Sequence, residues 1–224
     1  MPESRSKIIE LRALLAEKFP AGLRPEAARW QTGIGVLDAL LHGGLRRGTL
    51  TEIARREPAM GAAFLLQSLL ARAWAHEQRM ALVDGRDRLD PVGCARETLS
   101  ALLWVRCTGA AQALRATDLL LRDGNLPLVA LDLADNPARE LRAIPSTTWF
   151  RLQRIAEENA LSCLVFTPWP MVASAHTRLL LRRPLTLASL DARTDDLLGG
   201  LDLEMVRQRN EIGAPSEAPM ALAV

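Results

Sequence analysis

The chain has no tyrosine, few other aromatic residues and no long apolar segment. Aromatic residues make up 4% of the 224 residues, so a core must be built mainly from Leu, Ala and Val. No apolar run approaches the roughly 18–20 residues that span a bilayer, and the first residues lack the apolar stretch of a cleavable signal peptide. These absences predict a soluble protein of the cytoplasm with no membrane partner.

Neither charge nor metal-binding side chains indicate a particular ligand. The 28 Lys and Arg residues against 26 Asp and Glu residues give a net charge of +2, too small to require a nucleic-acid partner. The three cysteines lie far apart, and their odd number is typical of a reducing compartment. His42, His76 and His176 have no cysteine or carboxylate at ligand spacing, so we predict no metal site.

Apolar residues make up 49% of the chain, enough for the core of one α/β domain. From position 32 onward, short apolar runs alternate with longer helical patterns, after a short helix and a glycine turn at Gly43 and Gly44. The expected strands lie at 49–54, 80–84, 102–106, 126–133, 162–167, 177–183 and 201–209. The expected helices lie at 61–77, 110–124 and 147–160. Strands that are apolar on both faces predict a mostly parallel sheet flanked by helices, with the last two strands as an antiparallel addition.

Composition divides the chain into three regions. Residues 1–29 combine an amphipathic helix at 6–19 with a linker that contains proline and glycine. Residues 30–210 form the expected domain, and the Pro- and Ala-rich residues 211–224 form an expected disordered tail. Because the N-terminal helix has a single apolar side, it either docks on its own domain or binds another molecule.

Residues 51–67, TEIARREPAMGAAFLLQ, have the order of strand, loop and helix at which P-loop proteins bind phosphate. A working P-loop needs glycines whose N–H groups surround the phosphates, a lysine for their charge and a Ser or Thr hydroxyl for Mg²⁺. Here Gly61 is the only glycine, Pro58 removes one N–H donor, and Ala62 has no hydroxyl. We therefore predict no tight binding of Mg-nucleotide at this loop.

Several motifs between positions 32 and 167 resemble, in order and spacing, those of the RecA recombinase family. TGIGVLDALLHGGLRRGTLTEI resembles the segment that leads into the RecA P-loop, GRDRLDPVGCA resembles the D-x-E-x-x-x-D-P pattern, and QALRATDLLLRDGNLPLVALDLAD resembles the helix and Walker B strand. The resemblance implies a RecA-like core. It places the P-loop lysine position on Gly61, the adjacent hydroxyl position on Ala62 and the catalytic glutamate position on Arg86. The degenerate loop positions are Arg55, Met60, Gly61 and Ala62.

Of the nucleotide-binding groups, the resemblance retains only the Walker B aspartate, as Asp132. A single aspartate at a strand end is either a metal ligand or a solvated or capping residue. Phosphoryl transfer works through positioning and charge neutralisation, and here the lysine, the hydroxyl and the glutamate are all replaced. We predict that the protein is not an enzyme and binds no cofactor.

Among RecA-like chains without a working P-loop, this one resembles the ImuA family of bacterial damage-induced mutagenesis. The segments TGIGVLDALL, LVDGRDRLDP and LDLEMVRQRN carry the likeness. It implies a non-catalytic protein that binds ImuB, a relative of Y-family polymerases, and through it an error-prone replicative-type DNA polymerase and the sliding clamp. Contact with RecA or self-association is a further possibility. The alternatives are a SulA-like inhibitor of FtsZ and a divergent RecA-like ATPase.

The candidate partner-binding residues lie in the N-terminal helix and in the last strand. They are Ile8, Leu11, Leu15, Leu203, Met205, Val206, Arg207 and Arg209. Direct contact with DNA stays open, because the loops at 134–146 and 168–177 are short and only Trp169 offers a ring for base stacking. A local basic cluster either contacts phosphate or an acidic protein surface, or is simply solvated. It consists of Arg46, Arg47, Arg55 and Arg56.

Overall fold

The computed structural model of the protein describes residues 28–55, 61–182 and 194–208. These residues belong to one compact unit, Ala28–Arg209. The helix expected at 6–19 and the tail expected from position 211 lie outside the described residues. Within the described part of the chain, no helix is long and apolar enough to cross a membrane.

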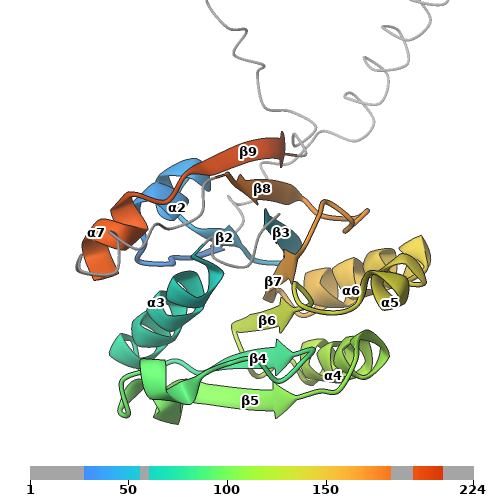
Figure 1. Cartoon of the computed structure of the whole chain (residues 1–224), viewed down its shortest axis with the longest axis horizontal. Helices are drawn as coiled ribbons and strands as arrows, with labels where there is room; N and C mark the ends of the chain where they lie inside the picture. The colour runs from blue at the N-terminus through green and yellow to red at the C-terminus, as the bar shows by residue number, and fades with distance from the viewer. Residues whose placement is uncertain (1–27, 56–60, 183–193, 209–224) are drawn as a thin grey trace, which may run out of the picture. The chain divides into compact units, whose positions relative to one another are not determined.

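A seven-stranded sheet forms the centre of this unit (Figure 1). Its order is β5-β4-β6-β7-β3-β8-β9. The strands are β3 (Thr49–Arg55), β4 (Met80–Asp84), β5 (Leu102–Arg106), β6 (Leu128–Asp132), β7 (Ser162–Thr167), β8 (Thr177–Leu181) and β9 (Leu203–Gln208). All neighbours from β5 to β8 pair in parallel, and β9 pairs antiparallel with β8. The α/β class, the mostly parallel sheet and the antiparallel pair are confirmed, although β8 itself runs parallel to β3.

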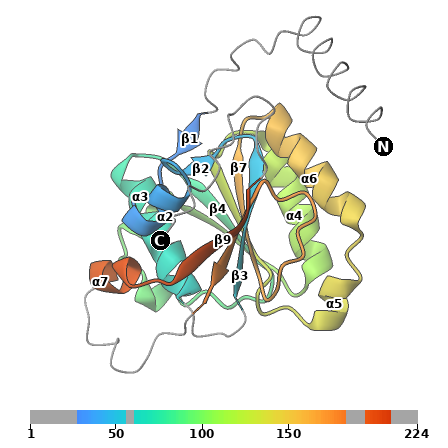
Figure 2. The ribbon, with the colours of Figure 1, turned by 90° about the horizontal axis from the view of Figure 1, so that it is seen from above.

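Helices cover both faces of the sheet, as Figure 2 shows from above. One face carries α2 (Gly35–Leu40), α3 (Ala62–Ala75) and α7 (Thr194–Gly199). The opposite face carries α4 (Ala110–Asp123), α5 (Ala138–Arg142) and α6 (Ser146–Glu158). Two short 3-10 helices, Pro91–Gly93 and Thr98–Ala101, connect β4 to β5. Each face therefore has its own apolar layer.

Aliphatic residues fill both layers, as the shortage of aromatic residues predicts. Strands β3, β4 and β7 are buried along their whole length. Trp149 and Phe166 are the largest fully buried side chains. Helix α4 ends where expected, at Gly124, whose φ of 76° lies in the left-handed region that favours glycine.

Four short elements were not expected from the sequence. Strand β1 (Arg29–Trp30) pairs antiparallel with β2 (Leu45–Arg46), so Arg29, which we assigned to the linker, is part of the domain. Helices α5 and α7 occupy segments that we read as loops. Two-residue strands and helices of five or six residues are too short to produce a clear hydrophobic period.

Candidate functional site

The carboxyl ends of β3, β4, β6 and β7 meet at one edge of the sheet, where ligands of α/β proteins usually bind. Polar side chains gather there, and we call them the strand-end cluster. The cluster consists of Glu52, Arg55, Asp84, Asp132, Asp135 and Thr167. It lies beside the junction between β3 and α3, where the sequence places the degenerate P-loop.

At this junction, Gly61 is the residue before α3 and has a φ of 86° and a ψ of 7°. This left-handed conformation disfavours a lysine side chain at the position where the resemblance places the P-loop lysine. Ala62 begins the helix without a hydroxyl, and no side chain caps the helix. Met60, Arg56 and Pro58 lie outside the described residues.

Arg55, at the end of β3, forms an ion pair with Asp135 in the loop after β6. Arg55 Nη2 lies 2.7 Å from Asp135 Oδ1, and the Arg55 side chain is only 8% exposed. The pair links the end of β3 to the loop that follows β6. Arg55, the last described cation before the junction, is therefore held by the protein's own carboxylate.

Asp132, to which the resemblance assigns the Walker B position, is half-buried at the end of β6. Its Oδ1 accepts the backbone N–H of Ala134 at 2.9 Å, which is the capping contact that we considered beside a metal role. Burial raises the pKa of Asp132 to about 6, although the Ala134 N–H and Arg55 oppose the shift and Asp135 adds to it. Among the described residues, no group of three or more His, Cys, Asp or Glu could hold a metal ion.

Asp84 organises the loop after β4. Its carboxylate accepts the backbone N–H groups of Arg86, Arg88 and Leu89 at 3.2, 2.8 and 2.8 Å. The Arg86 side chain, at the catalytic glutamate position, donates to the carbonyl of Thr108 at 3.3 Å. A guanidinium cannot accept a proton from water at neutral pH, so this position supplies no general base.

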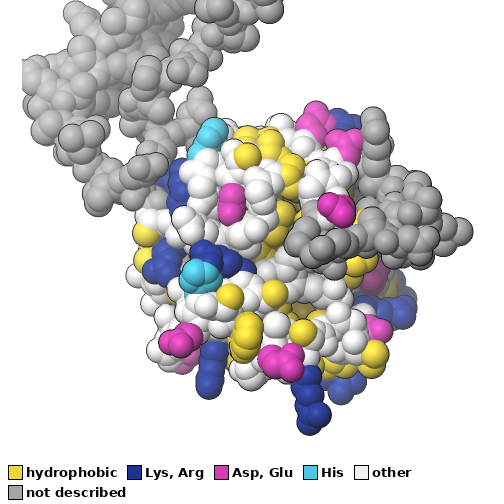
Figure 3. Space-filling model, turned by 90° about the vertical axis from the view of Figure 1, so that its left-hand side faces the viewer, with side chains coloured by type: hydrophobic (Ala, Val, Ile, Leu, Met, Phe, Trp, Pro, Cys, Tyr) yellow, Lys and Arg dark blue, Asp and Glu magenta, His cyan; other side chains and the backbone are white. Residues whose placement is uncertain are grey.

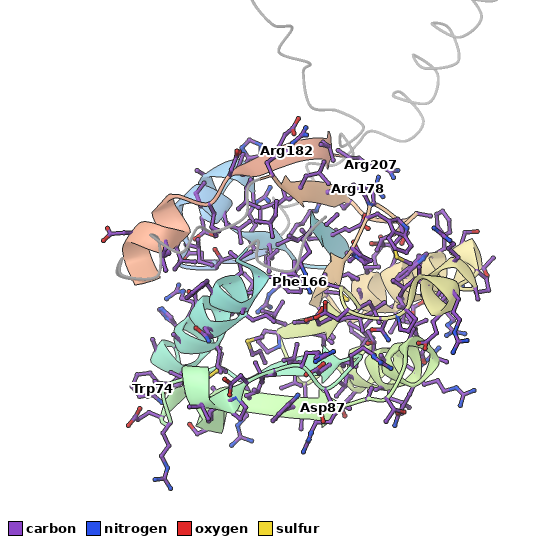
Figure 4. All side chains as sticks on the ribbon, viewed as in Figure 1. Trp74, Asp87, Phe166, Arg178, Arg182 and Arg207 are labelled. Atoms are coloured by element: carbon purple, nitrogen blue, oxygen red, sulfur yellow. The ribbon has the colours of Figure 1, made fainter. Side chains whose placement is uncertain are left out.

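Sequence reasoning missed the role of Glu52, which is fully buried in β3. Its Oε1 accepts the Thr167 hydroxyl at 3.0 Å and the N–H groups of Met171 and Val172 at 2.7 and 3.1 Å. Its Oε2 pairs with Arg178 on β8, which Figure 4 labels. The loop after β7 is therefore anchored to the core. A lone acid inside the buried strand TLTEIAR is the signal that could have identified it.

Sequence reasoning also missed Glu140, which lies on α5. Its Oε2 accepts the Ala110 N–H at 3.0 Å, at the start of α4. This contact lowers the pKa of Glu140, with a smaller contribution from Asn136 and from the charge of Arg86. Thus the first helical turn of α4 is already bound to a carboxylate from the protein itself.

The candidate partner-binding residues on β9 lie on the edge strand at one end of the sheet. Leu203, Met205 and Arg207 are half-buried, whereas Val206 is 43% exposed. A shallow hollow separates β9 from α2. It is lined by Leu40, Arg182, Asp202, Leu203, Glu204 and Met205. Ile8, Leu11, Leu15 and Arg209 lie outside the described residues.

The structure does not bring the expected basic cluster together. Arg46 and Arg47 precede β3, whereas Arg55 ends it, and Arg46 contacts His176 at 3.1 Å. Figure 3 shows one face of the molecule, on which basic, acidic and apolar side chains are mixed. The Trp169 ring is covered by the guanidinium of Arg142, 5.7 Å from the ring centre. These contacts weaken the case for a single-strand binding groove.

No protein-family model matches the chain, and no curated protein sequence matches it.

Proposed function

We propose that the protein is a non-catalytic RecA-like scaffold of the damage-induced translesion synthesis complex, as its resemblance to the ImuA family implies. In this proposal it binds ImuB and, through it, an error-prone DNA polymerase and the sliding clamp. The observation that supports the non-catalytic part is the ion pair between the buried side chain of Arg55 and the more exposed carboxylate of Asp135. It holds Arg55, the last described cation before the junction, while Gly61 and Ala62 supply neither cation nor hydroxyl.

The anchored loops give further support. Nucleotide-driven switches need segments of low stability that change conformation. Here the loop after β7 is held by buried Glu52, and the loop after β6 is held by Asp135. Loops fixed in this way suit a rigid surface that holds partners in place.

Strand β9 and the hollow beside it form the proposed ImuB surface. An edge strand can accept an extended segment of a partner, and the neighbouring hollow can take its apolar side chains. Leu203 and Met205 line this hollow, and Val206, the residue after Met205 on the same strand, is 43% exposed. Substitution of Val206 by arginine adds charge and bulk to this surface without changing the core.

Co-purification with ImuB tests this surface. We expect Val206→Arg to abolish co-purification and Leu119→Arg to leave it unchanged, because Leu119 is 68% exposed on α4, a helix of the other layer. Loss of damage-induced mutagenesis in cells carrying Val206→Arg is the matching functional result. Co-purification that survives Val206→Arg, or that is lost equally in Leu119→Arg, would contradict the assignment.

A specific observation keeps the divergent ATPase as the second candidate, since Asp132 is retained within the electrostatic reach of Arg55. Calorimetric titration with ATP and Mg²⁺ separates the two functions. The scaffold proposal expects no binding, whereas micromolar affinity that weakens in Asp132→Asn would establish the ATPase. The division-inhibitor alternative instead predicts direct binding to FtsZ and filamentous cells on overexpression.

A further inference from the structure

Strand β5 is the outermost strand at the end of the sheet opposite β9 (Figure 1). No other described strand pairs with its outer edge. Leu103 in this strand is 45% exposed, which is unusual for a leucine inside a sheet. An edge strand with exposed apolar side chains is a template for pairing with another strand.

Strand β5 lacks the features that usually protect an edge. The sequence Leu102–Arg106, LLWVR, contains no proline, and its five residues pair with β4 in unbroken register. Its one charge, Arg106, is held by both oxygens of Asp87 at 2.6 Å. By contrast, the β8–β9 pair has a register shift, and β9 carries Glu204 and Arg207. Of the two edges, β5 is therefore the less protected against pairing with another strand.

The backbone directions limit how a second strand can pair with β5. The Cys107 N–H points toward β4, because it donates to the Asp84 carbonyl at 2.8 Å. Directions alternate along a strand, so Trp104 and the two end residues of β5 direct their N–H and C=O groups outward. An antiparallel partner of identical sequence therefore pairs over the full strand only when Trp104 lies opposite Trp104.

Side chains are compatible with this register. It places Leu103 opposite Val105 of the second copy in a pair without hydrogen bonds, where side chains approach most closely. Trp104 faces Trp104, and Arg106 faces Leu102, so no like charges meet. Leu120 of α4 is half-buried against the same apolar layer as Val105 and can extend the contact.

We propose that two copies of this chain associate through their β5 strands, antiparallel about a two-fold axis at Trp104. The occupant of the open edge is a second copy because the strand is complementary to itself in the only fully overlapping register. A two-fold contact of this kind closes on itself and does not grow into a filament. The proposal is independent of the proposed function, since it leaves β9 at the far edge of each copy accessible.

Sedimentation equilibrium of the full chain tests the association. We expect a mass twice the 24.6 kDa of the monomer at micromolar concentrations. Leu103→Lys places an ammonium group opposite Val105 in each half of the interface, so we expect the dissociation constant to rise at least about tenfold. Leu119→Lys is the matched control, because it adds the same charge at an exposed site of α4 and should leave the dimer intact. Circular dichroism confirms that both variants fold.

Cross-linking tests the register itself. Residues opposite each other without hydrogen bonds have Cα atoms about 4.5 Å apart, within the range that a disulfide spans. In a background in which Cys94, Cys107 and Cys163 are replaced by serine or alanine, Leu103→Cys with Val105→Cys should give a covalent dimer on mild oxidation. Leu119→Cys in the same background should give none. A monomer in solution, masses that keep growing with concentration, or an equally stable Leu103→Lys dimer would overturn the proposal.

Discussion

Two carboxylates at the same edge of the sheet, the fully buried Glu52 and the half-buried Asp132, show how differently one fold can treat an acid. Glu52 accepts hydrogen bonds from four donors, two of them backbone N–H groups and one the guanidinium of Arg178. Asp132 accepts one backbone N–H, from Ala134, and burial, with smaller contributions from the charges of Asp135 and Asp84, raises its pKa to about 6.

The two carboxylates therefore have opposite effects on stability: ionised Glu52 stabilises the fold, whereas ionised Asp132 destabilises it. Burying a charge is strongly unfavourable unless a partner and hydrogen bonds compensate for lost hydration. Glu52 has that compensation, so the fold depends on it. Asp132 has little, so its ionised form weakens the folded state.

The largest expected effect is the loss of Glu52. Glu52→Ala leaves Arg178, the Thr167 hydroxyl and two backbone N–H groups without their acceptor inside the protein. Removal of one partner from a buried ion pair lowers the free energy of unfolding by about 3–5 kcal/mol. Urea unfolding followed by circular dichroism measures this loss.

A double-mutant cycle sharpens the result. We expect Arg178→Met to recover part of the stability in the Glu52→Ala background, because the uncompensated cation is then absent. Hydrogen exchange should also show the loop after β7 opening in Glu52→Ala. A loss below about 1 kcal/mol would mean that water replaces the Glu52 carboxylate and that the acid is not structural.

The second effect has the opposite sign and depends on pH. The folded-state pKa of Asp132, about 6, lies above the ordinary 3.8, so the folded state favours the protonated form. The destabilisation from ionisation is therefore absent below about pH 4, grows between pH 4 and 6, and is complete above pH 6. Asp132→Asn keeps an acceptor for the Ala134 N–H and should stabilise the protein at pH 7 by about 1–3 kcal/mol.

Thermal or urea unfolding of both proteins from pH 4 to pH 8 measures this difference. The gain from Asp132→Asn should shrink steadily as the pH falls from 6 to 4. Asp118→Asn provides a contrasting variant, because Asp118 pairs with both Arg122 and Arg151. That variant should be less stable at pH 7. If Asp132→Asn were destabilising at pH 7, the Asp132 charge would be favourable in the fold and the comparison with Glu52 would fail.

The sequence predicts the fold better than it predicts these two roles. Each long apolar run, such as the one that forms β6, is predictable as a strand because a strand inside a parallel sheet is buried on both faces. The partner of Glu52 is 126 positions away in the chain, and no local pattern records it. The position of Asp132 at a strand end was predictable, whereas its raised pKa depends on its burial in the folded protein and on charges from the ends of β3 and β4 and from the loop after β6.

The same limit applies to the junction. The sequence reveals that Gly61 and Ala62 lack the chemistry of a P-loop, since that conclusion needs only residue types. It does not reveal that Gly61 is left-handed or that Arg55 pairs with Asp135, because both depend on how β3 and β6 are brought together by the sheet. Residue types within one segment can be judged from the sequence, whereas pairing between distant segments cannot.

The smallest expected effect concerns the ion pair between Arg55 and Asp135. Its charges are compensated less fully than that of Glu52 and more fully than that of Asp132. Asp135 is 36% exposed, so water screens part of the charge that Asp135→Asn leaves on Arg55. We expect a loss of about 1–2 kcal/mol in unfolding free energy, in line with a hydrogen bond between charged groups. Arg154→Ala, which breaks an exposed pair with Glu158, should cost no more than about 0.5 kcal/mol under the same conditions. Equal losses in the two variants would mean that Arg55 is not held tightly by Asp135, and the cation at the junction would then be available to an anionic ligand.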